Sequence, residues 1–357
     1  MTERKMTALG GIRFVMGVGI ALVVAAATAV AGEDRATWLE DVPGGVVVVL
    51  DANSADALIG LRRSDAFFVQ AFCRDSARVT RLRRELDGRG LYGKICVDRW
   101  DGHEIPVIDN VVNVLVDEHG AATEAERLRV LVPGGIALTT SPQGPRTIRK
   151  PRPDAIDDWT HYLHGPDNNA VAEDTVVGPP GGVQWQADPK WTRHHDHMSS
   201  FSAMVSAGGR IFYILDEGSR ASIFLPSHWA LICRDAFNGK LLWKRAIPDW
   251  YTRFKGLKDG PADAPRRLAA TEDDVFVTLD LHGPVVRLDA RTGDIKATYA
   301  QTTGAEEILL DDGVLFVLIG PGSIGDGGRL VRPAEKRVLA AVSVDSGETL
   351  WTHEDVV

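Results

Sequence analysis

Two different hydrophobic patterns follow one another along this chain. Between residues 33 and 145, short apolar runs alternate with segments whose apolar side chains recur every three or four positions. The runs are typical of buried parallel strands, and the spaced segments are typical of amphipathic helices. The predicted strands are 46–50, 67–72, 95–97, 111–116 and 136–139, and the predicted helices are 54–63, 76–86 and 124–131. This alternation predicts an α/β, Rossmann-like domain with a doubly wound parallel sheet.

From residue 155 to residue 357 the helical spacing disappears, and short apolar runs are separated by Gly, Asp, Asn and Pro. This pattern predicts an all-β region. One nine-residue pattern recurs there, at 235–243, 289–297 and 343–351, and its glycines follow one another at intervals of 54 residues. An earlier segment with the same Gly-x-x-x-Trp ending, 181–185, begins 58 residues before Gly239. Near-equal spacing of this kind predicts stacked modules of one structural type.

Each repeat has the features of a β-hairpin. Asp or Asn close to Gly favours a tight turn in which the glycine adopts a positive φ. Trp243 and Trp351 close two of the repeats, and a ring of this size can be buried against a neighbouring module. A second matched run, at 210–213, 274–277 and 313–317, supplies another strand in each module. We therefore expect four-stranded blades of a β-propeller, of which about three are present.

Three blades would leave the propeller ring incomplete, because closure needs about four to eight blades. We expect the chain to be the N-terminal part of a longer protein, and assembly of several copies into one ring is the alternative. An open ring would expose sheet edges and apolar blade faces to water. The basic, Pro-rich segment 141–153 is expected to separate the α/β domain, 33–145, from the blades, 155–357.

The first 31 residues have the three parts of an export signal. Basic residues are followed by an apolar run, 14–27, and then by a small-residue cleavage site, Ala29–Ala31. We expect residues 1–31 to be a signal peptide and the mature chain to lie in the periplasm or cell envelope. An uncleaved membrane anchor is the alternative, because residues 14–31 are just long enough to span a bilayer.

Composition narrows the function classes. Of the 357 residues, 44% are hydrophobic and 25% are charged, which is enough apolar content for packed cores and fits two domains. The 40 basic and 49 acidic residues give a net charge of −9, so no net positive field attracts nucleic acid. Cys73, Cys96 and Cys233 are too far apart for a CxxC motif or a cysteine zinc site, and their odd number argues against a disulfide scaffold.

Three segments of the α/β region carry a family resemblance. Residues 126–135, Glu-Arg-Leu-Arg-Val-Leu-Val-Pro-Gly-Gly, form a helix end and a turn before the last predicted strand. Residues 100–106 follow the third strand, and residues 109–115 contain the fourth. In these segments the chain resembles the class I S-adenosylmethionine-dependent methyltransferases, over about 100 residues. The resemblance implies a Rossmann-like fold with S-adenosylmethionine as the cofactor.

The positions that would bind this cofactor are altered. A nucleotide-binding fold needs glycine after the first strand, so that the backbone can approach the ligand without an intervening Cβ. The loop here contains Asp51 and Asn53 but no glycine. Cys73 stands where an acidic residue is expected after the second strand, and Asp75 follows it by two positions. These four residues and Asp101 are the five candidate cofactor-binding residues. We expect a degenerate domain, and a domain that catalyses methyl transfer is the alternative.

The blades carry a second resemblance. The pattern Ala-x-Asp-x-x-Thr-Gly-x-x-x-Trp, with the lead-in at 159–169, 184–185 and 199–213, resembles the quinoprotein (PQQ-type) β-propellers over about 200 residues. That family includes pyrroloquinoline quinone alcohol dehydrogenases and scaffold propellers of outer-membrane protein assembly. For a dehydrogenase, the resemblance implies adjacent cysteines, calcium-binding groups and a catalytic Asp. The chain has no Cys-Cys pair, so quinone catalysis is expected only if further blades complete the site.

One dense group of metal-binding side chains stands at 194–197. On a strand, His195 and His197 would point to the same face, as two metal ligands can. The alternative is a polar loop whose histidines bond to backbone or water, because no third spaced ligand is identifiable.

These features together favour a binding or scaffold protein over an enzyme. No residue is identifiable as catalytic, and no cofactor is assigned beyond the S-adenosylmethionine or PQQ that the resemblances imply. We expect an exported protein of the cell envelope whose partners are other envelope proteins, further blades or further copies of the chain. Nucleic acid is not expected as a partner, and a membrane only if the signal segment stays uncleaved. The alternatives are a PQQ- or metal-dependent oxidoreductase and an S-adenosylmethionine-dependent methyltransferase.

Overall fold

The computed structural model describes residues 42–141, 144–193, 200–222, 225–248, 250, 264–320, 324–325, 329–330 and 336–356. The chain divides into two units, Met1–Pro43 and Gly44–Val357, and every helix and strand given below belongs to the second. The expected signal segment lies outside the described residues. Within the described ranges, no helix combines the length and the apolar character needed to cross a membrane.

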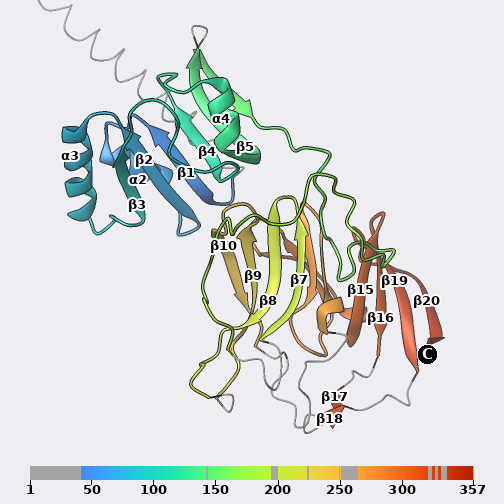
Figure 1. Cartoon of the computed structure of the whole chain (residues 1–357). Coiled ribbons are helices and arrows are strands. Elements are labelled where there is room, and N and C mark those ends of the chain that lie inside the picture. Colours follow the sequence, from blue (N-terminus) through green and yellow to red (C-terminus); the bar gives the residue numbers. More distant parts are fainter. Residues whose placement is uncertain are drawn as a thin grey trace, which may run out of the picture. The chain divides into compact units, whose positions relative to one another are not determined.

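The first part of the Gly44–Val357 unit is a six-stranded sheet with three helices (Figure 1). Its elements are β1 (Gly45–Leu50), α2 (Ala55–Leu61), β2 (Phe67–Cys73), α3 (Ser76–Asp87), β3 (Ile95–Arg99), β4 (Val112–Asp117), α4 (Glu124–Val130), β5 (Leu131–Ser141) and β6 (Gly144–Arg149). The strand order is β3-β2-β1-β4-β5-β6, with β1 to β5 parallel and β6 antiparallel to β5. This is a Rossmann-like order, so the predicted α/β fold class is confirmed.

Burial and capping explain why these residues form these elements. Residues 47–50 of β1 are all buried, which shows that both faces of the central strand are covered, as parallel sheets require. The side chains of Ser54, Asp75 and Thr123 accept backbone N–H groups at the starts of α2, α3 and α4. The apolar stripe predicted for α3 is also buried, at Val79, Leu82 and Leu86.

Two details of the sheet differ from the prediction. The segment 141–153 was expected to separate the two domains without secondary structure of its own being assigned to it, but β6 forms within it and pairs with β5. Pro145 fits there because an edge strand tolerates a residue without N–H. β5 also begins earlier than predicted, at Leu131. The strand continues through the expected Pro-Gly-Gly turn because Gly134 adopts a φ of 82° and the pairing with β4 shifts register at that point.

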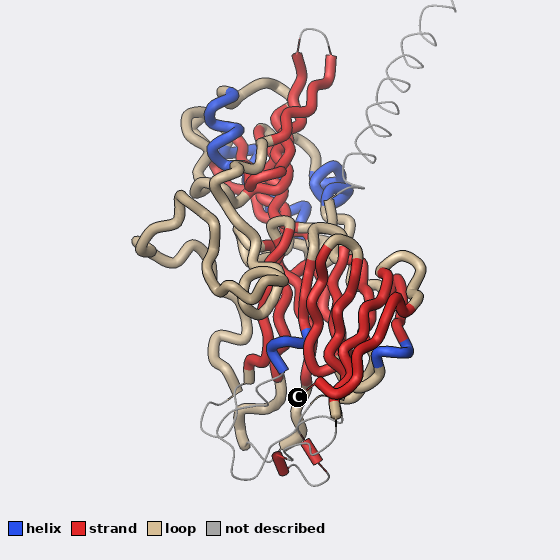
Figure 2. Tube along the Cα trace, turned by 90° about the vertical axis from the view of Figure 1, so that its right-hand side faces the viewer, coloured by secondary structure: helices blue, strands red, loops and turns tan. Residues whose placement is uncertain are grey.

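The second part consists of three four-stranded antiparallel sheets, here called the first, second and third blade sheets (Figures 1 and 2). The first contains β7 (Phe201–Ala207), β8 (Arg210–Asp216), β9 (Trp229–Asp235) and β10 (Leu241–Ala246); the second contains β11 (Leu268–Ala270), β12 (Asp274–Thr278), β13 (Val285–Asp289) and β14 (Ile295–Tyr299); the third contains β15 (Ala305–Asp311), β16 (Val314–Ile319), β19 (Arg337–Ser343) and β20 (Thr349–Val356). Two 3₁₀ turns, η1 (Ala264–Arg267) and η2 (Ala300–Thr302), and a short pair, β17 (Ile324–Gly325) with β18 (Arg329–Leu330), complete the described elements. The prediction of an all-β region of four-stranded modules is confirmed, whereas the strand orders do not show a propeller ring among the described residues.

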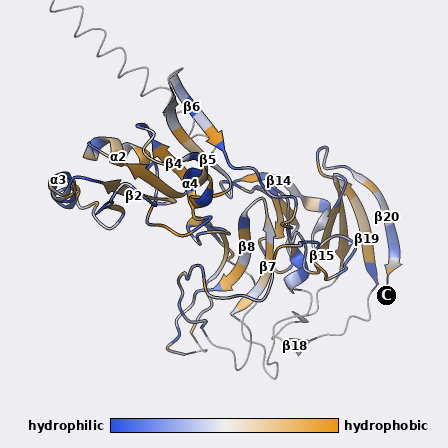
Figure 3. Ribbon diagram, turned by 45° about the horizontal axis from the view of Figure 1, so that its top comes forward, coloured by the Kyte–Doolittle hydropathy of each residue, from blue (hydrophilic) through white to orange (hydrophobic). Residues whose placement is uncertain are grey.

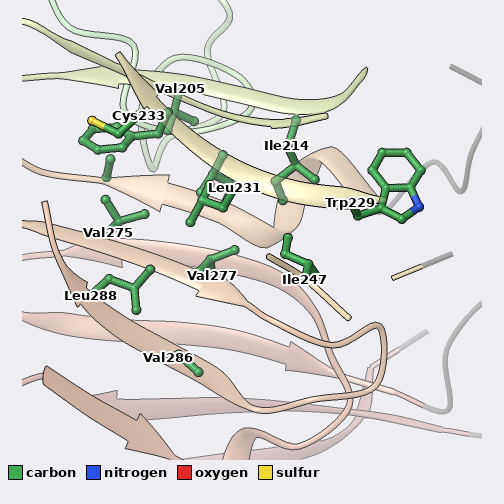
Figure 4. Packing of buried hydrophobic residues seen from close by; sticks show 14 of the residues in the cluster. Val205, Ile214, Trp229, Leu231, Cys233, Ile247, Val275, Val277, Val286 and Leu288 are labelled. Carbon is green, nitrogen blue, oxygen red and sulfur yellow. The ribbon is translucent and has the colours of Figure 1, made fainter. Parts of the chain in front are cut away.

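The blade sheets stack through alternating side chains. Val275 and Val277 of β12 belong to a core shared with the first sheet, whereas Phe276 between them belongs to a core shared with the third. Figure 4 shows Leu231 of the first sheet next to Val275 and Val277. The second sheet therefore buries both of its faces, which a single four-stranded module cannot do alone.

The lead-in segment ties the first strands of all three blade sheets together. The Ser206 N–H of β7 donates to the Trp159 carbonyl at 2.7 Å, and the Ala270 N–H of β11 donates to the Thr160 carbonyl at 3.0 Å. The Leu310 N–H of β15 donates to Nε2 of His161 at 3.0 Å. Three consecutive lead-in residues thus hold one strand from each sheet.

Candidate functional site

The first candidate site is the carboxyl edge of the α/β sheet. Open α/β sheets bind ligands outside the carboxyl ends of the strands, where the strand order reverses. Here the reversal lies between β1 and β4, and Asp51 follows β1 directly. Asn53 lies in the same loop, Cys73 ends β2, and Asp75 and Asp101 follow β2 and β3. The structure therefore brings all five sequence-predicted cofactor-binding residues to this edge.

Arginines close the loop after β1. The Arg74 N–H donates to Asp51 Oδ1 at 3.2 Å, its Nε donates to Oδ2 at 2.8 Å, and Nη2 completes an ion pair. Arg78 Nη1 donates to the Asp51 carbonyl at 3.4 Å, and Arg81 Nη2 donates to the Asn53 carbonyl at 2.9 Å. We call Arg74, Arg78 and Arg81 the arginine clasp. The clasp occupies loop groups that a bound cofactor would otherwise have available.

Electrostatics agree with this pairing. Burial raises the pKa of Asp51, but the hydrogen bonds and charge of Arg74 outweigh it and hold the pKa below its ordinary value. The Arg74 guanidinium carbon also lies 6.0 Å from the centroid of the Trp100 ring. Arg74 therefore links the loop after β1 to the loop after β3, across the end of β2.

The other predicted residues of this edge have mainly structural contacts. Cys73 is fully buried, and its Sγ donates to the Ala52 carbonyl at 3.2 Å. Burial raises the pKa of its thiol to about 11, so the sulfur stays protonated at neutral pH. Asp75 caps α3 by accepting the Ala77 N–H at 2.8 Å. Asp101 is exposed and accepts the His103 N–H at 3.0 Å.

A buried ion pair at the same edge is not apparent from the sequence. Asp117, the last residue of β4, is fully buried and accepts Arg127 Nε at 2.8 Å. It also accepts the N–H groups of Ala121 and Ala122, at 2.7 and 3.1 Å. These contacts fix the loop between β4 and α4. The only sequence signal was an acidic residue at the end of an apolar run.

The second candidate site is the series of aromatic contacts between modules. Trp185 Nε1 donates to the Ala236 carbonyl in the turn between β9 and β10, at 2.9 Å. Trp243 Nε1 donates to the equivalent Ala290 carbonyl of the second blade sheet, at 3.1 Å. Each ring lies against the glycine of that turn, because a Cβ on Gly239 or Gly293 would come within 2.3 or 2.7 Å of it. The predicted packing of a tryptophan on the neighbouring module is confirmed for these two contacts.

Tyr299 continues the series and was missed in the sequence. Its hydroxyl donates to the Val344 carbonyl in the turn of the third blade sheet, at 2.8 Å. Alignment of the repeats places Ala297 opposite Trp243, but the aromatic side chain that reaches the next turn stands two residues later.

Trp351 departs from the prediction. It stands in β20 at the repeat position of Trp243, yet 45% of it is exposed, and the neighbouring Leu350 is 54% exposed. Its ring contacts Phe316 of its own sheet, with centroids 6.0 Å apart. Within the described part of the chain, no turn accepts its indole N–H. In Figure 3, β19 is predominantly hydrophobic in colour, whereas β20 is paler and more hydrophilic.

The predicted metal site cannot be placed. His195 and His197 lie outside the described residues. Among the residues that are described, no group of three or more His, Cys, Asp or Glu side chains is arranged to hold a metal ion. His164 is paired instead with Asp157, through Nε2 and Oδ2 at 2.6 Å.

No family model matches this sequence. No curated protein matches it either. Among solved structures, the chain is similar to a protein from Methanococcus maripaludis assigned as an S-adenosyl-L-methionine-dependent methyltransferase, with 18% identity, a TM-score of 0.26, and coverage of 29% of this chain and 52% of the other. It is also similar to geranyl diphosphate C-methyltransferase from Streptomyces coelicolor, with 15% identity, a TM-score of 0.27, and coverage of 30% and 42%. A third similar structure, the [4+2]-cyclase SpnF, has 21% identity, a TM-score of 0.25, and coverage of 28% and 39%.

The chain thus spans about half or less of the length of each of these proteins. With identities and TM-scores this low, the Rossmann-like class of the α/β domain is defined by its own strand order.

Proposed function

We propose that this chain is an exported binding protein of the cell envelope, which uses β20 of the third blade sheet to bind a further β-sheet module. The observation that carries the proposal is the aromatic series. Trp185, Trp243 and Tyr299 each donate to a carbonyl in the turn of the following sheet. Trp351 has the same place in its repeat and an exposed ring. Export is inferred from the apolar run and cleavage site of residues 14–31.

The chemistry of this surface fits one kind of partner. An exposed indole next to an exposed leucine offers a large apolar contact with one hydrogen-bond donor at its rim. The three turns that already accept an aromatic ring present a backbone carbonyl beside a glycine of positive φ. All three of these turns are filled within the chain. The partner is therefore a separate four-stranded module with a turn of the same type, carried by another envelope protein or by further blades.

A hairpin of the chain itself can stand in for that partner. A cyclised peptide with the sequence of residues 229–246 offers the turn that accepts Trp185. When this peptide is added to the full chain labelled with ¹⁵N-tryptophan, we expect the indole N–H signal of Trp351 to shift. The signal is assigned by its loss in Trp351→Phe. A peptide with Gly239→Val is the matched control, because a side chain at this position collides with the docked ring.

The proposal predicts saturable shifts of the Trp351 signal with the parent peptide. The control peptide should bind at least about tenfold more weakly, because it loses one close apolar contact and its hydrogen bond. An unchanged Trp351 signal at millimolar peptide, or equal binding of both peptides, would show that this surface does not bind such a turn.

A second candidate function, S-adenosylmethionine-dependent methyl transfer, is favoured by one specific observation. The α/β sheet has its strand reversal next to β1 and keeps Asp101 exposed at the same edge. Methyltransferases are among the similar solved structures. Against this candidate, the arginine clasp pairs the Asp51 carboxylate, and Cys73 replaces an acidic residue with a buried thiol.

Titration calorimetry with S-adenosylmethionine separates the two candidates. We expect no binding heat at millimolar ligand, because the clasp pairs the Asp51 carboxylate and binds the Asp51 and Asn53 carbonyls of the same loop. Circular dichroism on the same sample checks that the chain is folded. Micromolar binding that is lost in Asp101→Asn would instead favour the methyltransferase candidate, since this exposed residue supports only a local turn in the structure.

A further inference from the structure

A pocket of about 910 Å³ lies away from the carboxyl edge of the α/β sheet and from β20, and it borders the turn between β9 and β10 on which Trp185 packs. Its walls come from the starts of β1 and β2, the turn between β9 and β10, and the segment 186–191. We call it the basic pocket, and it is lined by Val46, Phe68, Gln186, Ala187, Asp188, Lys190, Trp191, Arg234, Asn238, Gly239, Lys240 and Leu241. A pocket of this size can enclose most of a small organic ligand.

Hydrogen bonds within the Gly44–Val357 unit fix one wall of this pocket. Asn238 Nδ2 donates to Asn113 Oδ1 at 2.8 Å and to the Val111 carbonyl at 3.0 Å. Asn113 Nδ2 in turn donates to Asp235 Oδ2 at 2.6 Å. The turn is thereby joined to β4, so the pocket is built from ordered elements on this side.

Three cations line the pocket, and none of them has a carboxylate partner among the described residues. Arg234 donates from Nε to the Tyr213 hydroxyl and from Nη1 and Nη2 to the carbonyls of Gly239 and Asp188, each at 2.8 Å. These acceptors hold the guanidinium in place without neutralising it. Lys190 Nζ lies 5.4 Å from the ring centroid of Trp191 and forms no ion pair with any residue that the structure describes.

Lys240 completes the set from the turn. The described residues offer its ammonium group neither a hydrogen-bond acceptor nor an ion-pair partner, and the nearby carboxylate of Asp65 is already bound to Arg62. Asp188 supplies the only acidic side chain of the lining, so the pocket carries an excess of positive charge. Low-dielectric walls concentrate such a charge and attract anions.

The apolar part of the lining is partly aromatic. Trp191 is 61% exposed, and Phe68, Val46 and Leu241 also border the pocket. An exposed indole beside unneutralised cations suits a ligand that has a planar ring and an acidic group on the same small molecule.

We propose that the basic pocket binds a small planar aromatic anion, whose carboxylate or phosphate is held by Lys190, Lys240 and Arg234 and whose ring lies on Trp191. The proposal does not depend on the function proposed for β20. It also does not depend on the carboxyl edge of the sheet, since the pocket adjoins the opposite, amino ends of β1 and β2.

Four probes of matched structure test the proposal on the full chain by titration calorimetry. They are 1-naphthyl phosphate, 1-naphthoate, neutral 1-naphthol and inorganic phosphate. We expect at least one aromatic anion to bind with a submillimolar Kd, at least about tenfold more tightly than 1-naphthol and inorganic phosphate. Its affinity should fall as the salt concentration is raised. The tighter of the two anions identifies the acidic group.

Charge-removing variants connect the binding to this pocket. The double variant Lys190→Gln, Lys240→Gln is expected to bind the aromatic anion at least about tenfold more weakly, because about two charge-assisted contacts are lost. Lys244→Gln is the matched control, because Lys244 lies on the adjacent strand, pairs with Glu217 and does not line the pocket. It should change the affinity less than about twofold.

Three outcomes would overturn the proposal. They are no binding of either anion at millimolar concentration, equal affinity for 1-naphthol, and unchanged affinity in the double lysine variant. Binding to β20 is read from a different signal, so failure here leaves the function proposed for that surface intact.

Discussion

Gly293→Val is expected to destabilise the blade sheets by about 2–5 kcal/mol. Gly293 adopts a φ of 76° in the turn between β13 and β14, a region that a β-branched residue rarely enters. A Cβ at this position would also lie 2.7 Å from the ring of Trp243. The strain of the turn costs about 1–2 kcal/mol, and overpacking adds about 1–3 kcal/mol.

Gly313→Val separates these two causes. Gly313 has nearly the same φ, 74°, but no atom lies within 4 Å of the position of its missing Cβ. This variant should therefore lose only the turn strain, about 1–2 kcal/mol. Urea unfolding followed by tryptophan fluorescence gives both free energies. Equal losses in the two variants would contradict a close contact between Trp243 and this turn.

The repeat pattern predicted this contact because turn and ring recur at a fixed interval. Gly239 and Gly293 need positive φ, and their tryptophan partners stand in the preceding module. The pattern failed at Tyr299, because a tyrosine two residues further along reaches the same kind of carbonyl. It also failed at Trp351, which is 45% exposed and whose ring contacts Phe316 of its own sheet. The spacing of the repeats therefore predicts the positions of the glycine turns, but not which aromatic ring packs on each turn.

In the α/β domain, too, the sequence predicts the local elements but not the tertiary contacts. Strands buried on both faces and capped helices leave a strong local signal, so their positions could be predicted to within a few residues. The antiparallel edge strand β6 was missed because its exposed face carries Pro and basic residues, which resemble a linker. The arginine clasp could not be predicted, since Arg74, Arg78 and Arg81 are separated by more than twenty residues in the chain from the loop that they close.

In both the α/β domain and the blade sheets, tertiary contacts decide the chemistry of the residues that the sequence pattern places. The five residues expected to bind a cofactor do gather at one edge, as the strand order requires. Their chemistry is decided by tertiary neighbours: Arg74 pairs Asp51, and burial keeps the Cys73 thiol protonated. The exposed Trp351 and the basic pocket are likewise defined by what surrounds them, and neither could be inferred from spacing.

Acid is expected to destabilise the blade sheets through His161. This side chain is 3% exposed, and burial lowers its pKa from 6.5 to about 4. Its Nε2 accepts the Leu310 N–H, so Nδ1 carries the ring proton and donates to the Thr160 hydroxyl. A second proton on Nε2 would face the Leu310 N–H and break the contact between the lead-in segment and β15. The charges of Asp311 and Asp167 favour that proton, but they do not offset the burial.

The direction of the pH effect follows from the two pKa values. In the unfolded chain His161 takes up a proton near pH 6.5, whereas in the folded chain it does so only near pH 4. The stability that the neutral ring contributes is complete above pH 6.5 and is lost as the pH falls towards 4. The loss is about 1.4 kcal/mol per pH unit, or about 3 kcal/mol in all.

Urea unfolding at pH 7, 6 and 5 measures this loss against His161→Gln. The glutamine keeps an acceptor oxygen for the Leu310 N–H but does not titrate, while the carboxylates titrate equally in both proteins. We expect the variant to be less stable than the parent chain at pH 7 and the difference to shrink by about 2 kcal/mol at pH 5. A difference that stays constant across this range would show that His161 is protonated equally in the folded and unfolded chains.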